Sequence, residues 1–168
     1  GGFQPEADPP LAEMPPLAQT VRERSSLTGF TLIEIMVVVG VIALLAVVAV
    51  PQYLRLRMNA YETAAVASLK TVHKACIMYY SANANTYPLN GLSDLMSDTP
   101  AYIDSVLGSG VKQGYQFSFT FIDADHYSVN ADPLTLGSTG NRYFYLDETG
   151  VVRSATGGLA TASDPVAS

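Results

Sequence analysis

Apolar residues fill almost every position from Phe30 to Val50, and this run is the strongest pattern in the chain. No charged residue occurs between Ile35 and Leu54. At 1.5 Å per residue, a helix of about 20 residues is roughly 30 Å long, which matches the hydrocarbon core of a bilayer. The pattern therefore predicts a helix that can span a membrane.

Beyond this run the apolar positions recur at steps of three and four residues, which is the spacing of one helix face. The polar residues of this segment, such as Glu62, His73 and Lys74, are expected to lie largely on the other faces. The helix is expected to end between Ala82 and Asn85, where small and polar residues precede Pro88. The predicted apolar stripe consists of Leu54, Met58, Tyr61, Ala65, Leu69, Val72, Cys76 and Tyr79.

Two residues are expected to disturb the helix without ending it. Gly40 interrupts the apolar run, and Pro51 closes it. Proline lacks a backbone N–H and clashes with the carbonyl one turn earlier, so a kink or local melting is predicted at Pro51. Helical spacing resumes beyond Pro51, which argues against a helix end there.

After Pro88 the pattern changes to alternation, which predicts strands. Tyr115 to Phe121 places aromatic residues on one side and polar residues on the other. Further strands are predicted over 127–131, 142–146 and 151–154, joined by turns that are rich in Asp and Gly. Packing the aromatic face of this sheet on the apolar stripe of the helix would bury both. The predicted fold is therefore α+β, with a long N-terminal helix on a four-stranded antiparallel sheet.

The segments between and after these elements carry weaker signals. A short helical turn is expected within residues 89–96, and a loop is expected over 102–107. The tail after Gly157 is rich in Ala, Ser and Gly, and we expect it to be frayed.

Composition excludes several functions. The formal net charge of −6 argues against nucleic acid as the main partner, because phosphate binding needs a basic surface. Cys76 is the single cysteine, so an intrachain disulfide is impossible, and a buried apolar role is expected for it. His73 and His126 are expected to be solvated surface residues. No catalytic constellation, phosphate loop or cofactor motif occurs, so neither an enzyme nor a cofactor site is predicted.

Four acidic residues near the C-terminus raise the question of a calcium site, since calcium prefers several carboxylate oxygens. Asp123 and Asp125 form one pair, and Asp147 and Glu148 form another. Both pairs fall where tight turns are predicted, and Asp is a favoured turn residue. We therefore interpret them as turn residues and predict no metal site.

Glu34 is the one ionisable residue in the apolar run. A carboxylate at the centre of a bilayer costs about 2.5–3.5 kcal/mol, so its presence suggests a use for the charge. It follows four residues after Phe30, in the sequence Gly29-Phe30-Thr31-Leu32-Ile33-Glu34. This arrangement resembles the class III signal of type IV prepilins and pseudopilins.

The resemblance implies processing and assembly roles for named residues. In that family a dedicated peptidase cuts after the glycine, here between Gly29 and Phe30, and the new N-terminal residue is methylated. The carboxylate at Glu34 is then expected to meet the N-terminal amine of a neighbouring subunit in a filament. The family's filaments are often partly unwound near the positions of Gly40 and Pro51.

The same resemblance divides the chain into three parts. Residues 1–29 are expected to form a cytoplasmic leader that is removed, with Arg22 and Arg24 holding it inside by the positive-inside rule. Residues 30–54 are expected to form the transmembrane and polymerisation half of the helix. Residues 55–168 are expected to form a periplasmic or extracellular head, in which the amphipathic helix continues to about residue 84.

The implied function is that of a type IV pilus subunit. Its expected partners are copies of itself, the membrane, the prepilin peptidase, and an inner-membrane assembly platform with its cytoplasmic ATPase. The precursor would lie in the inner membrane, and the product would be an extracellular pilus or a periplasmic pseudopilus. A pseudopilin of a type II secretion system is the main alternative. A signal-anchored periplasmic binding protein is a remote one, because the apolar run is longer than a signal core and no Ala-x-Ala site follows it.

Overall fold

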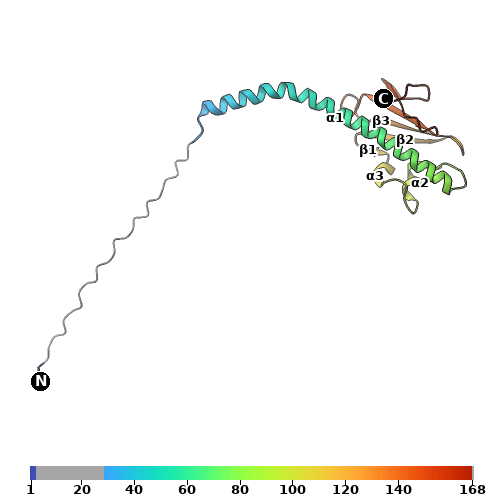
Figure 1. The fold of residues 1–168 in the computed structure, drawn as a ribbon, viewed down its shortest axis with the longest axis horizontal. Helices are drawn as coiled ribbons and strands as arrows, with labels where there is room; N and C mark the ends of the chain where they lie inside the picture. Colours follow the sequence, from blue (N-terminus) through green and yellow to red (C-terminus); the bar gives the residue numbers. More distant parts are fainter. Residues whose placement is uncertain (3–28, 168) are drawn as a thin grey trace. The chain divides into compact units, whose positions relative to one another are not determined.

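The computed structural model describes residues 1–2 and 29–167, and its first helix is its longest element (Figure 1). The predicted leader therefore lies largely outside the described residues. Helix α1 spans Leu32–Ala82, and its 51 residues include Pro51. Its end at Ala82 lies within the predicted range of Ala82 to Asn85. The described residues group into two compact units, with the boundary between Val39 and Gly40.

The second half of α1 has one buried face, as its spacing predicts, although Leu54 of the predicted stripe is 50% exposed and lies outside that face. Ala65, Leu69, Val72 and Cys76 are each exposed by 1% or less. One member of the buried face was not expected there, because Glu62 is only 5% exposed. It precedes Ala65 by three residues and Leu69 by seven, so helical geometry puts all three on the same side.

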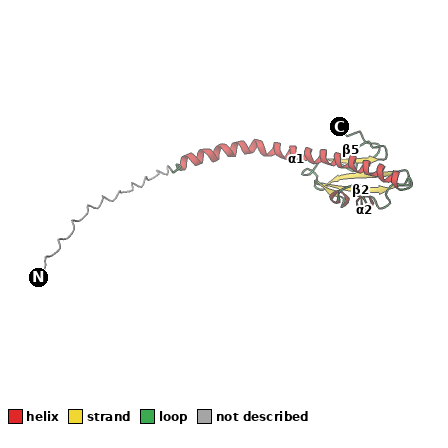
Figure 2. Ribbon diagram, turned by 60° about the horizontal axis from the view of Figure 1, so that its bottom comes forward, coloured by secondary structure: helices red, strands yellow, loops and turns green. Residues whose placement is uncertain are grey.

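The strands form one antiparallel sheet in the order β1-β2-β3-β4-β5. Figure 2 shows this sheet in yellow beside the second half of α1. All four predicted strands are present, but the sheet has five strands rather than four. The bounds are β1 Val111–Lys112, β2 Tyr115–Phe121, β3 Tyr127–Pro133, β4 Arg142–Asp147 and β5 Arg153–Thr156. The last strand therefore begins two residues later than predicted.

The unexpected strand β1 exists because of the turn that follows it. Gln113 and Gly114 have φ angles of 48° and 78°, and they are the two residues between the paired positions Lys112 and Tyr115. Two positive φ angles define the type I′ turn that matches the twist of a hairpin. A two-residue strand is too short to show alternation in a sequence.

Two short helices complete the head. The predicted helical turn is α2 (Leu92–Ser97). The segment 102–107 was expected to be a loop, but it contains the start of α3 (Ser105–Gly108). Asp104 caps α3, because its Oδ1 accepts a hydrogen bond of 2.8 Å from the backbone N–H of Leu107.

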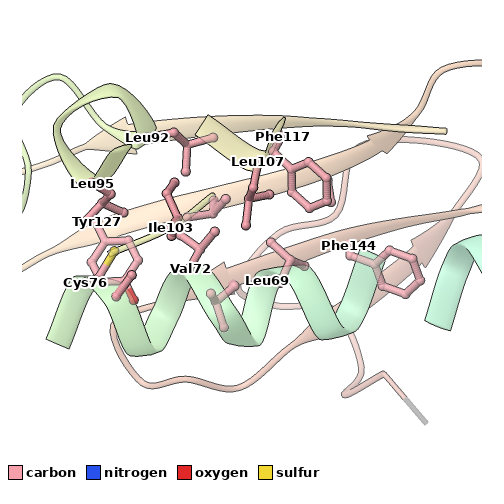
Figure 3. Packing of buried hydrophobic residues seen from close by; sticks show 14 of the residues in the cluster. Leu69, Val72, Cys76, Leu92, Leu95, Ile103, Leu107, Phe117, Tyr127 and Phe144 are labelled. Atoms are coloured by element: carbon pink, nitrogen blue, oxygen red, sulfur yellow. The ribbon is translucent and has the colours of Figure 1, made fainter. Parts of the chain in front are cut away.

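The core lies between α1, α2, α3 and one face of the sheet (Figure 3). Leu69, Val72 and Cys76 of α1 contribute to the same cluster as Tyr127 and Phe144 of the sheet. In β2, Tyr115 is fully buried and Phe117 is 4% exposed, while the polar residues that alternate with them are exposed, so the aromatic face predicted from alternation is confirmed. Burial of this apolar surface, at about 25 cal/mol per Å², is what holds helix and sheet together.

The C-terminal tail is more ordered than its composition suggests. Val166 forms a bridge with Arg153 of β5, and the N–H of Ser154 donates to the carbonyl of Pro165 at 2.9 Å. Ala160 is 2% exposed, and its carbonyl accepts a hydrogen bond from Asn130. The expectation of a frayed tail is therefore wrong for these residues. The tail covers the outer edge of β5, which would otherwise expose unpaired backbone groups.

Candidate processing and assembly segment

The segment at the start of α1 carries the predicted processing residues. Gly29 and Phe30 precede the first helical residue, Leu32, and both are exposed. A Cβ built on Gly29 would meet no atom within 4 Å. Both residues of the predicted cleavage bond are therefore exposed, and Phe30 itself is 79% exposed.

Glu34 is held at the first turn of α1 by a reciprocal hydrogen-bond pair with Thr31. The backbone N–H of Thr31 donates to Glu34 Oε2 at 3.4 Å, and the backbone N–H of Glu34 donates to Thr31 Oγ1 at 3.3 Å. This is a capping box, in which both side chains satisfy donors that lack a partner within the helix. The carboxylate also lies at the positive end of the helix dipole.

The capping box gives Glu34 a local structural role that the sequence interpretation missed. The signal was present, because Thr followed three residues later by Glu marks a helix start. The bonds join residues 31 and 34, so they would survive a cut after Gly29. A test of the assembly role must therefore separate the charge of Glu34 from its capping bonds.

The apolar half of α1 is exposed throughout. Leu32 is 77% exposed, Leu44 is 74% exposed and Val47 is 73% exposed. Among the described residues, α1 is the one helix long and apolar enough to cross a membrane, by its length and composition. Among the described residues, every residue from 30 to 54 is exposed, so none of the described part of the chain covers this segment.

Gly40 and Pro51 both lie inside α1. A Cβ added to Gly40 would meet no atom within 4 Å, so within one chain the glycine is not needed for space. Pro51 leaves one carbonyl of the preceding turn without its helical donor. The kink at these positions remains a prediction.

Glu62 joins α1 to the beginning of β4. Its Oε1 accepts a hydrogen bond of 2.8 Å from the backbone N–H of Asn141, and its Oε2 accepts one of 2.8 Å from Arg142 Nε. The Glu62 side chain is 7% exposed, whereas that of Arg142 is 33% exposed. A buried carboxylate with both oxygens bonded is stable because the bonds offset its loss of water.

His73 is not the solvated residue that was expected. Its Nδ1 lies 2.8 Å from the Tyr127 hydroxyl, and a Cβ on Gly150 would come within 2.5 Å of its Nε2. Burial lowers the pKa of His73, and Asp147 opposes that shift. Cys76 is fully buried, as expected, and burial raises the pKa of its thiol to about 12.

His126 is exposed, as expected, but it has an acidic partner. Its Nδ1 lies 2.7 Å from Asp123 Oδ1, which also accepts a hydrogen bond from the backbone N–H of Asp125. Asp147 Oδ1 accepts from the backbone N–H of Thr149 at 3.1 Å. Asp123 and Asp147 are thus turn residues, as predicted. Across residues 1–2 and 29–167, no group of three or more His, Cys, Asp or Glu side chains could hold a metal ion.

The architecture defines a class of protein. Its long helix begins with a capping box that contains a carboxylate, has an exposed apolar first half, and packs on an antiparallel sheet along its second half. No model of a known protein family matches the chain. Over 90 residues it is 34% identical to the type IV wide pilus major component PilA4 of Thermus thermophilus, a match that covers 52% of this chain and 68% of that protein. The chain therefore belongs to the type IV pilin family, whose members are structural and non-enzymatic.

Proposed function

We propose that this chain is a structural subunit of a type IV pilus that polymerises with copies of itself. The similarity to a pilus major component supports this function. Residues 1–29 act as a cytoplasmic leader, residues 30–54 act as the membrane and polymerisation segment, and residues 55–168 form the head. A peptidase cuts between Gly29 and Phe30, and Phe30 is then methylated.

The observation that carries the proposal is the complete exposure of the apolar half of α1. Large side chains such as Ile33, Val37 and Leu45 are each more than half exposed. Apolar surface of this extent is stable in a bilayer or against other apolar helices, but not in water. Leaving the bilayer must therefore be offset by burial between subunits, at about 25 cal/mol per Å². The same segment thus anchors the precursor and forms the centre of the filament.

In this proposal, Glu34 sets the axial position of each subunit relative to its neighbour in the filament. The contacts of the capping box use Oε2, which leaves the second oxygen to accept from the amine of Phe30 in a neighbouring subunit. An ammonium and a carboxylate among apolar helices attract strongly, and removing either one leaves the other costly to bury. Pairing therefore favours one axial position of the incoming subunit.

The remaining partners follow from this role. The prepilin peptidase acts at the cytoplasmic side, and an inner-membrane platform driven by an ATPase inserts the subunit into the filament. The precursor lies in the inner membrane with its C-terminus outside the cytoplasm. The pilus is favoured over a secretion pseudopilus because the matched relative is a pilus component.

Mass spectrometry of filaments sheared from cells that produce the chain tests the proposal. We expect an N-terminal methyl-Phe30 and surface fibres in electron micrographs. Fibres confined to the periplasm would favour the pseudopilus. A protein that kept its leader, or that stayed monomeric in solution without detergent, would contradict the proposal.

A further inference from the structure

The exposed surface of α1 beyond the apolar half carries positive charge alone. Between residues 55 and 82 the single acidic residue is Glu62, which is buried and bonded to Arg142. The cations of this part of the helix are all exposed, and they are Arg55, Arg57, Lys70 and Lys74. Arg55 and Arg57 come first and directly follow the segment 30–54.

The opposite charge gathers at the far end of the head. The sheet is a meander, so the β2–β3 turn and the β4–β5 turn lie at the same end. The two turns and the last residue of β4 hold the four residues that we call the acidic end, namely Asp123, Asp125, Asp147 and Glu148. Asp123 chiefly, with smaller contributions from Glu148 and Asp125, raises the pKa of His126, as expected for acidic groups that lie close together.

A hydrogen bond places the acidic end relative to α1. The hydroxyl of Tyr80 donates to Asp125 Oδ1 at 2.9 Å, so the acidic end lies beside the last turn of the helix. Arg57 precedes Tyr80 by 23 residues, which corresponds to about 35 Å along a helix. The cationic start of the head and its acidic end are therefore too far apart to neutralise each other within one chain.

We propose that Arg55 and Arg57 of one copy bind the acidic end of a second copy that is displaced by about 35 Å along the helix axis. This inference rests on the proposed function, and it adds which surfaces of two heads meet. The contact joins two different surfaces. Each copy therefore binds one neighbour along the filament through its arginines and the other neighbour through its acidic end. Such a contact does not close on itself and builds an open helical filament.

Three observations favour a second copy over another partner. The opposite charges sit on the same molecule, so every copy carries both halves of the contact. The arginines also continue directly from the segment that is buried between subunits in the proposed filament. Exposed apolar side chains lie beside both charged groups, since Leu56 is 66% exposed and Ile122 is 57% exposed.

Cysteine cross-linking of filaments tests the contact directly. Leu56 lies between the two arginines and Ala124 lies between Asp123 and Asp125, so Leu56→Cys with Ala124→Cys keeps every charge. The native Cys76 is buried and does not compete. A disulfide needs Cα atoms within about 7 Å, so the two new cysteines cannot join within one chain. Oxidised filaments of the double variant are expected to give a ladder of dimers, trimers and longer chains.

Matched variants define the specificity of the ladder. Each single-cysteine variant can form dimers at most. Leu56→Cys with Ser118→Cys places the second cysteine on an exposed position of β2, away from the acidic end, and is expected to give no ladder. Intact filaments of the Leu56→Cys/Ala124→Cys variant that yield no ladder would overturn the contact while leaving the proposed function in place. Absence of filaments from the unaltered chain would instead count against the proposed function.

Charge exchange provides a second measurement that does not depend on cysteines. Arg55→Glu with Arg57→Glu is expected to lower the yield of sheared filaments at least tenfold. Adding Asp123→Lys and Asp125→Lys to that variant is expected to restore most of the yield. A full yield from the arginine variant, or no restoration by the added lysines, would contradict the contact.

Discussion

The two halves of α1 are both α-helical, but their apolar side chains differ in exposure. Leu45 in the first half is 65% exposed, whereas Leu69 in the second half is fully buried. The second half is buried within the same chain, because the sheet covers its apolar stripe. The first half is apolar on every side, and the described residues provide nothing to cover it.

The difference teaches how one helix can serve two kinds of contact. A stripe of apolar residues specifies packing on a single surface, which here is the sheet of the same chain. An apolar surface on all sides specifies burial among several neighbours or in lipid. The boundary lies near Met58, which is the first partly covered residue of the helix. Substitutions on either side of it should therefore affect different properties.

The largest expected effect is on assembly, from removing the charge of Glu34. Glu34→Gln retains a side chain that can complete the capping box, but it cannot neutralise an ammonium group. Leaving that charge unpaired among apolar helices is expected to cost about 3 kcal/mol per subunit, or roughly a hundredfold in filament yield. Quantitative immunoblots of sheared filaments measure this, and the amount of membrane-bound precursor should not change. Normal filament yield from Glu34→Gln would show that capping alone explains the residue.

A matched pair of leucines separates folding from assembly. Leu69→Ala is expected to lower the free energy of unfolding of the head by about 3 kcal/mol, because it leaves a cavity in the core. Leu45→Ala is expected to change it by less than about 0.5 kcal/mol. Urea titration of the detergent-solubilised protein measures both. Equal effects of the two substitutions would mean that the halves of α1 are not independent.

The link between α1 and β4 should matter less than the core. Glu62→Ala is expected to cost about 2 kcal/mol, because the N–H of Asn141 loses its acceptor and Arg142 loses its buried carboxylate. The matched control is Lys112→Ala, which breaks a surface pair with Asp104 and should cost no more than about 0.5 kcal/mol. The same urea titration compares them. A Glu62→Ala variant as stable as Lys112→Ala would contradict the proposed link.

The smallest effect is a pH dependence that should be confined to the head. The pKa of His73 is lower in the folded chain than its ordinary value of 6.5, so the unfolded chain takes up a proton first as the pH falls. Stability from this group is therefore complete above about pH 6.5 and declines as the pH falls toward the folded pKa. Thermal unfolding between pH 7 and 5 measures the decline, which His73→Gln should reduce. An unchanged slope in that variant would assign the decline to other groups.

Much of the fold was predictable because its signals are local. The run 35–54, the stripe through Leu69 and Val72, and the alternation of Tyr115–Phe121 each reflect a period that a single element imposes. The missed strand β1 is too short to show a period. The covered tail depends on backbone pairing between Val166 and Arg153, and side-chain composition does not encode that pairing.

The candidate site was predictable to a different degree. Gly29, Phe30 and Glu34 were found by their resemblance to a known signal, whereas the capping role of Thr31 was visible in the sequence and was overlooked. The burial of Glu62 could not be inferred alone, because its partner Arg142 lies 80 residues away. The position of His73 likewise depends on Tyr127, which is 54 residues distant.

Electron cryomicroscopy of sheared filaments tests the central claim most directly, since it reports where residues 30–54 lie in the assembled state. The account predicts that these helices bundle at the filament axis, with the side chains of Leu44 and Val47 buried against neighbouring copies. Filaments joined through their heads alone, with the apolar halves still uncovered, would contradict it.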